Sequence, residues 1–157
     1  MNTGFAKWPE FIAPTVTSTS PETAVTKRQY ETLANFRYQL RRYLRYSERV
    51  TRTQGITPLQ YQLMLQVQGY PGRDWATVSE LAERLQAKHH GVVALLTRCA
   101  KRGLLARRAS ASDRRSVEVR LTPKGRKTLQ RIAQLHLEEL LTLHGQFSVP
   151  DPKAITP

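Results

Sequence analysis

The segment KRGLLARRASASDRRSVEVRLTPKG, residues 101–125, carries the most informative pattern in this chain. From residue 116 to residue 121 apolar and polar side chains alternate, which is typical of a strand with one buried face. The apolar residues 104–106 predict a second strand, and the residues between the two strands form a polar, basic tip. Two strands on either side of such a tip predict a β-hairpin.

Two short helices are predicted immediately before this hairpin. Residues 77–80 (TVSE) fit a capping box that begins the first helix, which carries Leu81, Ala82 and Leu85 inward. The second helix covers about residues 88–102 and ends at Gly103, a residue suited to a helix C-terminus. Its predicted inner stripe is formed by Val92, Leu95, Leu96 and Cys99. Two short helices joined by a tight turn predict a helix-turn-helix, and the hairpin after it is then the wing of a winged helix.

Longer amphipathic helices are predicted on both sides of this unit, over about residues 27–52 and 123–144. Thr122 followed by Pro123 is a typical opening of a helix, as is Thr57 followed by Pro58 for a helix in between. The last helix has more apolar residues than one wall of so small a domain would bury, so both long helices are expected to form a dimerisation bundle. The predicted fold class is mainly α with a small β-wing (α+β).

The domain is therefore expected to span residues 27–144. Residues 1–26, with three prolines and a Ser/Thr run, have the composition of a flexible N-terminal arm. Residues 145–157, also with three prolines, are expected to be a C-terminal tail.

The charge of the chain favours polyanionic partners. The 157 residues include 25 Lys and Arg against 12 Asp and Glu, a net charge of +13. Residues 84–131 hold fourteen basic side chains against two acidic ones, and residues 27–53 hold eight against two. A solvated helix surface explains the charge of residues 27–53 equally well, but residues 84–131 lack acidic partners at helical spacing. Nucleic acid is the expected partner.

Several classes of protein are excluded by the same composition. No apolar run approaches the roughly 18 residues of a membrane span, and no secretory signal precedes the domain, so a cytoplasmic, nucleoid-associated protein without a membrane partner is expected. Cys99 is the sole cysteine, so no intramolecular disulfide and no cysteine-type zinc site can form, and it is expected to act as a small core hydrophobe. No catalytic constellation and no phosphate-binding glycine loop is found, so neither an enzyme nor a cofactor is predicted.

The four histidines are not expected to bind metal. His89 and His90 are adjacent on the predicted helix, where neighbouring side chains point apart, and no cysteine or carboxylate cluster accompanies them. Contact with DNA is the preferred interpretation for this pair. His136 and His144 are predicted to be surface or interface residues of the last helix.

Five segments of the chain share the order and spacing of a known family: GITPLQY (55–61), TVSELA (77–82), KRGLL (101–105), DRR (113–115) and VRLTPKG (119–125). Over roughly residues 30–143 the chain resembles the MarR family of winged-helix transcriptional regulators. The resemblance implies a homodimer held by the N- and C-terminal helices. It also implies a recognition helix, residues 88–98, in the major groove of an inverted-repeat operator, and a wing that reaches toward the minor groove.

The resemblance assigns the DNA contacts by position. The implied wing pair is Asp113 and Arg115, with Arg115 as the candidate for minor-groove insertion. The predicted DNA-binding residues are Lys88, His89, His90, Gly91, Val93, Arg98, Arg107, Arg108, Arg114 and Arg115. The family often starts this helix with a small hydroxyl residue, where this chain has KHHG (88–91), which leaves the operator sequence open. The predicted first helix contains no cysteine, so peroxide sensing by a first-helix thiol is not expected.

A small aromatic or phenolic effector is a further implication of the resemblance, because the family places such ligands between the dimer helices and the winged helix. The candidate lining residues are Tyr38, Arg42, Tyr61, Met64 and Trp75, for which core packing is the alternative. The predicted function is a sequence-specific DNA-binding regulator, a repressor that an aromatic ligand releases. The alternative is a non-specific basic nucleic-acid-binding or nucleoid-associated protein without an effector.

Overall fold

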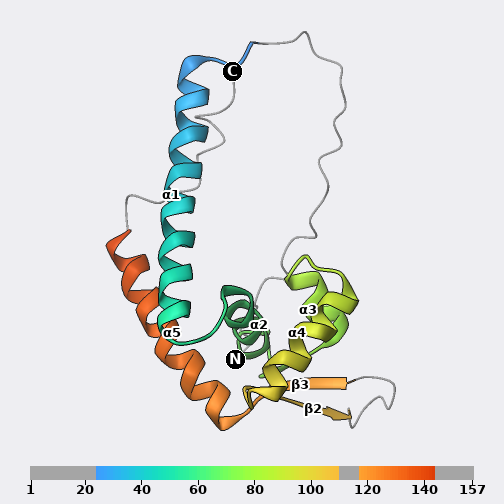
Figure 1. The fold of residues 1–157 in the computed structure, drawn as a ribbon. Helices are drawn as coiled ribbons and strands as arrows, with labels where there is room; N and C mark the ends of the chain where they lie inside the picture. The colour runs from blue at the N-terminus through green and yellow to red at the C-terminus, as the bar shows by residue number, and fades with distance from the viewer. Residues whose placement is uncertain (1–23, 110–116, 144–157) are drawn as a thin grey trace, which may run out of the picture.

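The computed structural model describes residues 24–109 and 117–143 (Figure 1). Along the chain the elements are α1 (Lys27–Thr53), α2 (Pro58–Gln68), β1 (Trp75–Thr77), α3 (Val78–Arg84), α4 (His89–Lys101), β2 (Leu105–Ala109), β3 (Val117–Leu121) and α5 (Pro123–Thr142). Helix predominates and the strands form one small antiparallel sheet, which confirms the predicted class. Helices α3 and α4 followed by the β2–β3 hairpin form the predicted winged helix-turn-helix.

The sheet has the strand order β1-β3-β2. In the hairpin, Leu105 is opposite Leu121 and Arg107 is opposite Val119. Strand β1 pairs with the other edge of β3, with Trp75 opposite Arg120. β1 was not predicted from the sequence, because three residues are too few to show an alternating pattern and the strand depends on a partner more than forty positions away.

Threonine caps begin most of the helices, as predicted. The side chains of Thr57 and Thr77 accept hydrogen bonds from the amides of Gln60 and Glu80, whose own side chains complete a capping box. Thr122 caps α5 through the amide of Gly125. At the other end of α4, Gly103 has a φ of +67°, which confirms the predicted terminator.

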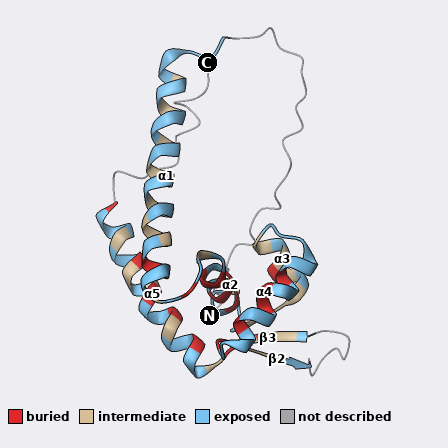
Figure 2. Cartoon of the chain, viewed as in Figure 1, coloured by how far each residue is buried: buried red, intermediate tan, exposed pale blue. Residues whose placement is uncertain are grey.

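The core joins α2, α4, the sheet and α5. Its fully buried side chains include Leu63, Met64, Leu81, Leu96 and Ile132. The predicted stripe of α4 is buried throughout, since Val92, Leu95, Leu96 and Cys99 are at most 4% exposed. Figure 2 shows the buried positions concentrated on α2, on α4 and along α5, whereas most of α1 is exposed. The winged helix-turn-helix together with α2 and α5 is therefore a packed unit from which α1 projects.

His136 was predicted to be a surface or interface residue, but it is only 3% exposed within the single chain, where its partners come from α1, α2 and α5. Its ring stacks on Tyr61 with 4.6 Å between centroids and 19° between planes. Nδ1 lies 2.8 Å from the carbonyl oxygen of Ile132, and Nε2 lies 2.8 Å from Oγ of Ser47. These contacts satisfy both ring nitrogens, which is why a polar residue is stable where α1, α2 and α5 meet.

Large apolar side chains remain exposed on α1 and α5. They include Tyr30, Leu33, Tyr38 and Leu44 on α1, and Leu137, Leu140 and Leu141 on α5. Within the described residues, no helix combines the length and apolar character needed to cross a bilayer. His144 and the predicted tail over 145–157 lie outside the described residues, as does the predicted arm up to residue 23.

Candidate nucleic-acid interface

Helix α4 presents an exposed face opposite its buried stripe. The predicted recognition residues Lys88, His89, His90, Gly91, Val93 and Arg98 are all exposed. The 13 residues of α4 give a helix roughly 20 Å long, a size that a major groove admits. The structure therefore brings this predicted group together on one accessible surface.

The N-terminus of α4 differs from that of the other helices. Lys88 occupies the N-cap position but makes no side-chain capping hydrogen bond, whereas threonines cap α1, α2, α3 and α5. Among the described residues, nothing lies within 4 Å of the point where a Cβ of Gly91 would sit. The first amides of α4 are thus open to an approaching acceptor, and a helix N-terminus favours a negative one such as phosphate.

The basic side chains of residues 84–131 fall into two groups. Several are bound internally: Arg102 donates to the carbonyl oxygen of Gly55 at 2.6 Å, and Arg120 bridges Asp74 at 2.8 Å and Glu118 at 3.1 Å. Others hold neighbouring elements together, namely Arg84 to Gln66, Arg126 to the carbonyl of Leu121 and Arg131 to Gln54. Sequence reasoning treated all of them as one surplus, although internal hydrogen bonds occupy many of them.

The free group lies on and beside α4. Within the described part of the chain, no hydrogen bond or ion pair involves the side chains of Lys88, Arg98 or Arg108. Arg108 is opposite Glu118 on β3, on the sheet face away from the buried Val119. Lys88 and Arg98 are the described positive charges best placed to meet a polyanion that contacts α4, whereas Arg108 extends the positive surface on the other face of the sheet.

Arg107 is exposed but not free. Its Nη2 donates to the carbonyl oxygen of Val93 at 3.2 Å and to Oγ1 of Thr97 at 2.9 Å. Thr97 was not singled out from the sequence, and its only signal was a hydroxyl four residues after Val93 on the outer face of α4. The remaining predicted wing residues Asp113, Arg114 and Arg115 lie outside the described residues.

Arginine side chains and aromatic rings form a cation–π cluster where the turn before β1 meets α3 and β3. The guanidinium carbon of Arg73 lies 4.2 Å from the ring centroid of Tyr70 and 3.8 Å from that of Trp75. Arg84 covers Tyr70 at 4.4 Å, and Arg120 covers Trp75 at 5.6 Å. Cation–π contacts of this kind hold the turn before β1 against α3 and β3.

Glu80 is the carboxylate that organises this cluster. It forms an ion pair with Arg73 and accepts hydrogen bonds from the hydroxyl of Tyr70 at 3.0 Å and the amide of Thr77 at 2.7 Å. Burial raises the pKa of this carboxyl, but the hydrogen bonds from Thr77, Arg73 and Tyr70 lower it by more, so the pKa lies below its ordinary value. The ionised form of Glu80 is thus part of the native structure.

The five candidate ligand-lining residues do not line one common cavity. Tyr61 and Met64 are core residues, and burial raises the pKa of Tyr61 to about 12. The ring of Trp75 is contacted by the guanidinium groups of Arg73 and Arg120. Tyr38 and Arg42 do share a surface hollow of about 330 Å³, which is also lined by Arg41, Arg45, Tyr46, Arg49 and Glu139.

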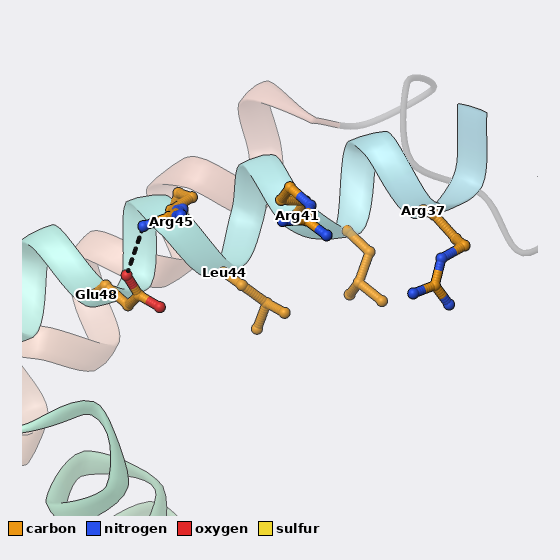
Figure 3. Close-up of a pocket in the computed structure, with 6 residues that line it drawn as sticks. Arg37, Arg41, Leu44, Arg45 and Glu48 are labelled. Carbon is orange, nitrogen blue, oxygen red and sulfur yellow. Dashed lines mark hydrogen bonds and ion pairs between the residues drawn. The ribbon is translucent and has the colours of Figure 1, made fainter. Parts of the chain in front are cut away.

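Two further hollows are present. One, of about 350 Å³, is formed along α1 and is lined by Arg37, Arg41, Leu44 and Arg45 (Figure 3). At its end Arg45 forms an ion pair with Glu48 at 3.5 Å. The other, of about 380 Å³, is mostly apolar and lies between Leu65 of α2 and Leu129 and Ala133 of α5. No group of three His, Cys, Asp or Glu within the described ranges could hold a metal ion.

A family model and a curated relative both match this chain. Residues 54–116 match the family model of the MarR family. A Thauera aromatica protein, named as a transcriptional regulatory protein for the hcr operon, is 29% identical over 98 residues. That match covers 62% of this chain but only 57% of the length of the relative.

Solved structures share the fold. A MarR family transcription regulator is 28% identical with a TM-score of 0.64, covering 76% of this chain and 77% of its own. A Staphylococcus aureus MepR variant bound to an oligodeoxyribonucleotide is 24% identical with a TM-score of 0.59, covering 76% and 84%. NadR in complex with 4-hydroxyphenylacetate is 21% identical with a TM-score of 0.62, covering 69% and 75%.

Proposed function

We propose that this chain is a transcriptional regulator that binds double-stranded DNA sequence-specifically as a homodimer. The premise is that the chain belongs to the MarR family through residues 54–116. The observation that carries this proposal is the exposed face of α4, where Lys88 and Arg98 have no described partner and the first amides have no cap. A surface of this kind suits a groove with a phosphate rim, and nothing in it resembles a catalytic centre.

Each part of this surface has a role in the proposed complex. Helix α4 enters the major groove, where His89, His90 and Val93 face base edges and Lys88 and Arg98 meet phosphates. Arg108 extends the positive surface along β2 toward the wing, and Arg115 at the wing enters the minor groove. The MepR variant bound to an oligodeoxyribonucleotide supports this arrangement by its shared fold.

Dimerisation is proposed to use α1 and α5. Leu137, Leu140 and Leu141 are exposed on α5, and Leu33 and Leu44 on α1, although leucine in a monomer is usually buried. The C-terminal end of α5 also carries Glu138 and Glu139, whose charge is opposite to that of Arg37 and Arg41 on α1. Two copies related by a two-fold axis place their α4 helices on an inverted repeat with half-sites about 10 bp apart.

The test is selection of bound fragments from a random DNA pool, followed by fluorescence anisotropy on the selected site and on a scrambled site across a salt series. The native protein is expected to prefer the selected site. Arg98→Ala removes one phosphate contact from each of the two subunits, so it is expected to weaken both complexes and to reduce the log–log salt slope by about 1.8. Arg28→Ala, at the far end of α1 (Figure 1), removes the same charge and is expected to leave both affinities unchanged.

Two results would contradict the proposal. Equal affinity of the native protein for both sites at physiological salt would favour the non-specific, nucleoid-associated alternative. A stable mass near 18 kDa by light scattering at micromolar concentration would rule out the homodimer.

We further propose that the regulator is a cytoplasmic repressor that an aromatic acid releases from DNA. The hollow that holds Tyr38 and Arg42 supports this, because it offers a ring and several guanidinium groups to an aromatic carboxylate. NadR in complex with 4-hydroxyphenylacetate shows that a protein of this fold binds such a molecule. Titration of 4-hydroxyphenylacetate and benzoate onto the preformed complex should release DNA, and Arg42→Ala should raise the concentration needed. Unchanged anisotropy at millimolar concentrations of both acids would contradict the effector proposal.

A further inference from the structure

A polar contact joins the wing strand β2 to the exposed face of α4. Nη2 of Arg107 donates to Oγ1 of Thr97 at 2.9 Å and to the carbonyl oxygen of Val93 at 3.2 Å. The hydroxyl of Thr97 donates in turn to the same carbonyl oxygen at 2.9 Å. The three groups therefore form a closed network between the recognition helix and the wing.

Strand register explains why Arg107, and not Arg108, makes this contact. Arg107 is opposite Val119, which is completely buried, so both side chains lie on the sheet face that the helices cover. Arg108, one residue later, lies on the other face opposite Glu118. Arg107 is the middle residue of β2, two residues closer to the tip than the buried Leu105, and its side chain reaches the outer face of α4.

The position of the network on α4 is also informative. Val93 is one of the residues proposed to face the bases, and its carbonyl is one of the two acceptors that hold Arg107. Nε and Nη1 of Arg107 donate to no other described group, so the network uses one end of the guanidinium only. A change in the angle between β2 and α4 would break both bonds at once.

We infer that Arg107 and Thr97 act as a positioning pair that fixes the recognition helix relative to the wing. This inference rests on the proposed function and adds the residues that set its geometry. Base contacts in the major groove and wing contacts in the minor groove must be made together, so their spacing must match the DNA. A pair that fixes this spacing contributes to sequence preference although neither of its hydrogen bonds touches a base.

A role for Arg107 as a phosphate contact alone would give different consequences. In that case Thr97 would be irrelevant, and any variant of Arg107 that keeps its charge would bind as before. If Thr97 instead contacted a base directly, its loss would weaken binding whether or not Arg107 were present. The two residues therefore have to be changed separately and together.

The experiment uses Thr97→Val, Arg107→Lys and the double variant of the full chain. Thr97→Val keeps the shape but removes the hydroxyl, and Arg107→Lys keeps the charge but lacks the planar fork. The readouts are the affinity ratio between selected and scrambled DNA, the salt slope and the urea midpoint. Each single variant is expected to lower the ratio by about three- to tenfold, the range for one hydrogen bond, with the salt slope unchanged.

The double variant is expected to lower the ratio and the urea midpoint no further than either single change, because each change already breaks the network. Thr97→Ser restores the hydroxyl and should restore the native ratio. Multiplicative effects of the two changes, or a native ratio in Thr97→Val, would overturn the inference while the native protein still prefers its selected site. A native protein without any preference would refute the proposed function itself, and the positioning role with it.

Discussion

Gly125→Ala tests the packing of the joint between the wing and α5. Gly125 lies in the first turn of α5, and a Cβ at this position would sit 2.0 Å from the carbonyl oxygen of Leu104 and 2.9 Å from its carbonyl carbon. Ordinary van der Waals contact begins at 3.4 Å, so backbone must move by about 1.4 Å to admit one methyl group. Leu104 is 2% exposed and lies between the end of α4 at Lys101 and the start of β2 at Leu105, which leaves little room for that movement.

The loss of stability in Gly125→Ala depends on the hydrogen bonds that this backbone movement would disturb. Thr122 bonds to this turn through its amide, 3.1 Å from the oxygen of Leu104, and through its hydroxyl, 2.6 Å from the oxygen of Gly103. Each of these hydrogen bonds contributes about 0.5–1.5 kcal/mol, and overpacking costs about 1–3 kcal/mol. The higher helix propensity of alanine offsets about 1 kcal/mol. The free energy of unfolding is therefore expected to fall by about 1–5 kcal/mol.

Urea unfolding followed by circular dichroism, at one fixed protein concentration, measures this change. Gly91→Ala is the matched control, because Gly91 is the other glycine inside a described helix and has open space around its Cβ position. There the same substitution should raise the free energy of unfolding by about 0.5–1 kcal/mol. A native midpoint for Gly125→Ala, or an equal loss at both positions, would refute the argument from close packing.

Four further predictions concern other residues. Gln86 lies just after α3 at a φ of +50°, and the amide of Ala87 donates to the carbonyl oxygen of Ala82. Glycine adopts such a positive φ without strain, so Gln86→Gly should raise the free energy of unfolding in urea by about 1 kcal/mol. His136→Ala should lower it by about 2–4 kcal/mol, since the change removes a buried ring and two hydrogen bonds. Folding lowers the pKa of Glu80, so the stability that its carboxylate contributes is complete above the ordinary pKa of 4.5 and is lost as the pH falls through the pKa of the folded state. Thermal melts between pH 7 and pH 3 should therefore show a smaller loss of stability for Glu80→Gln than for the native protein. Burial raises the pKa of the Cys99 thiol, so thiol reagents should label it slowly in the folded protein, and rapid labelling that releases DNA would indicate a redox switch instead.

Local signals in the sequence predicted much of the fold. The capping box of residues 77–80 and the Thr-Pro pairs at 57–58 and 122–123 identified where helices begin, and Gly103 identified where α4 ends. Apolar spacing gave the buried stripe of α4 correctly, because a helix alone determines which of its residues share a face. The same spacing left Lys88 and Arg98 outside that stripe, so the exposed face of the candidate site was also predictable.

The features that were missed depend on partners distant in the sequence. β1 exists only because three residues pair with β3, and His136 is buried only because Tyr61 and Ser47 meet it from other helices. The role of Arg107 follows from its register with Val119, which a hairpin of unknown tip length does not reveal. None of these relations is visible in a window of neighbouring residues.

The distribution of charge bears on the proposed sequence-specific binding by a strongly basic protein. Arg102 and Arg120 are bound to groups of their own chain, where they fix loops and the sheet, and Arg107 joins the wing strand to α4. In the proposed complex, Lys88 and Arg98 remain for phosphates, since neither has a described hydrogen bond or ion pair. A chain whose cations were all free would bind any polyanion in proportion to its charge, because phosphate contacts alone carry no sequence information. Arginines committed to internal contacts instead hold the recognition helix at a fixed angle, so the remaining charges can reach phosphates only where the groove geometry matches that angle.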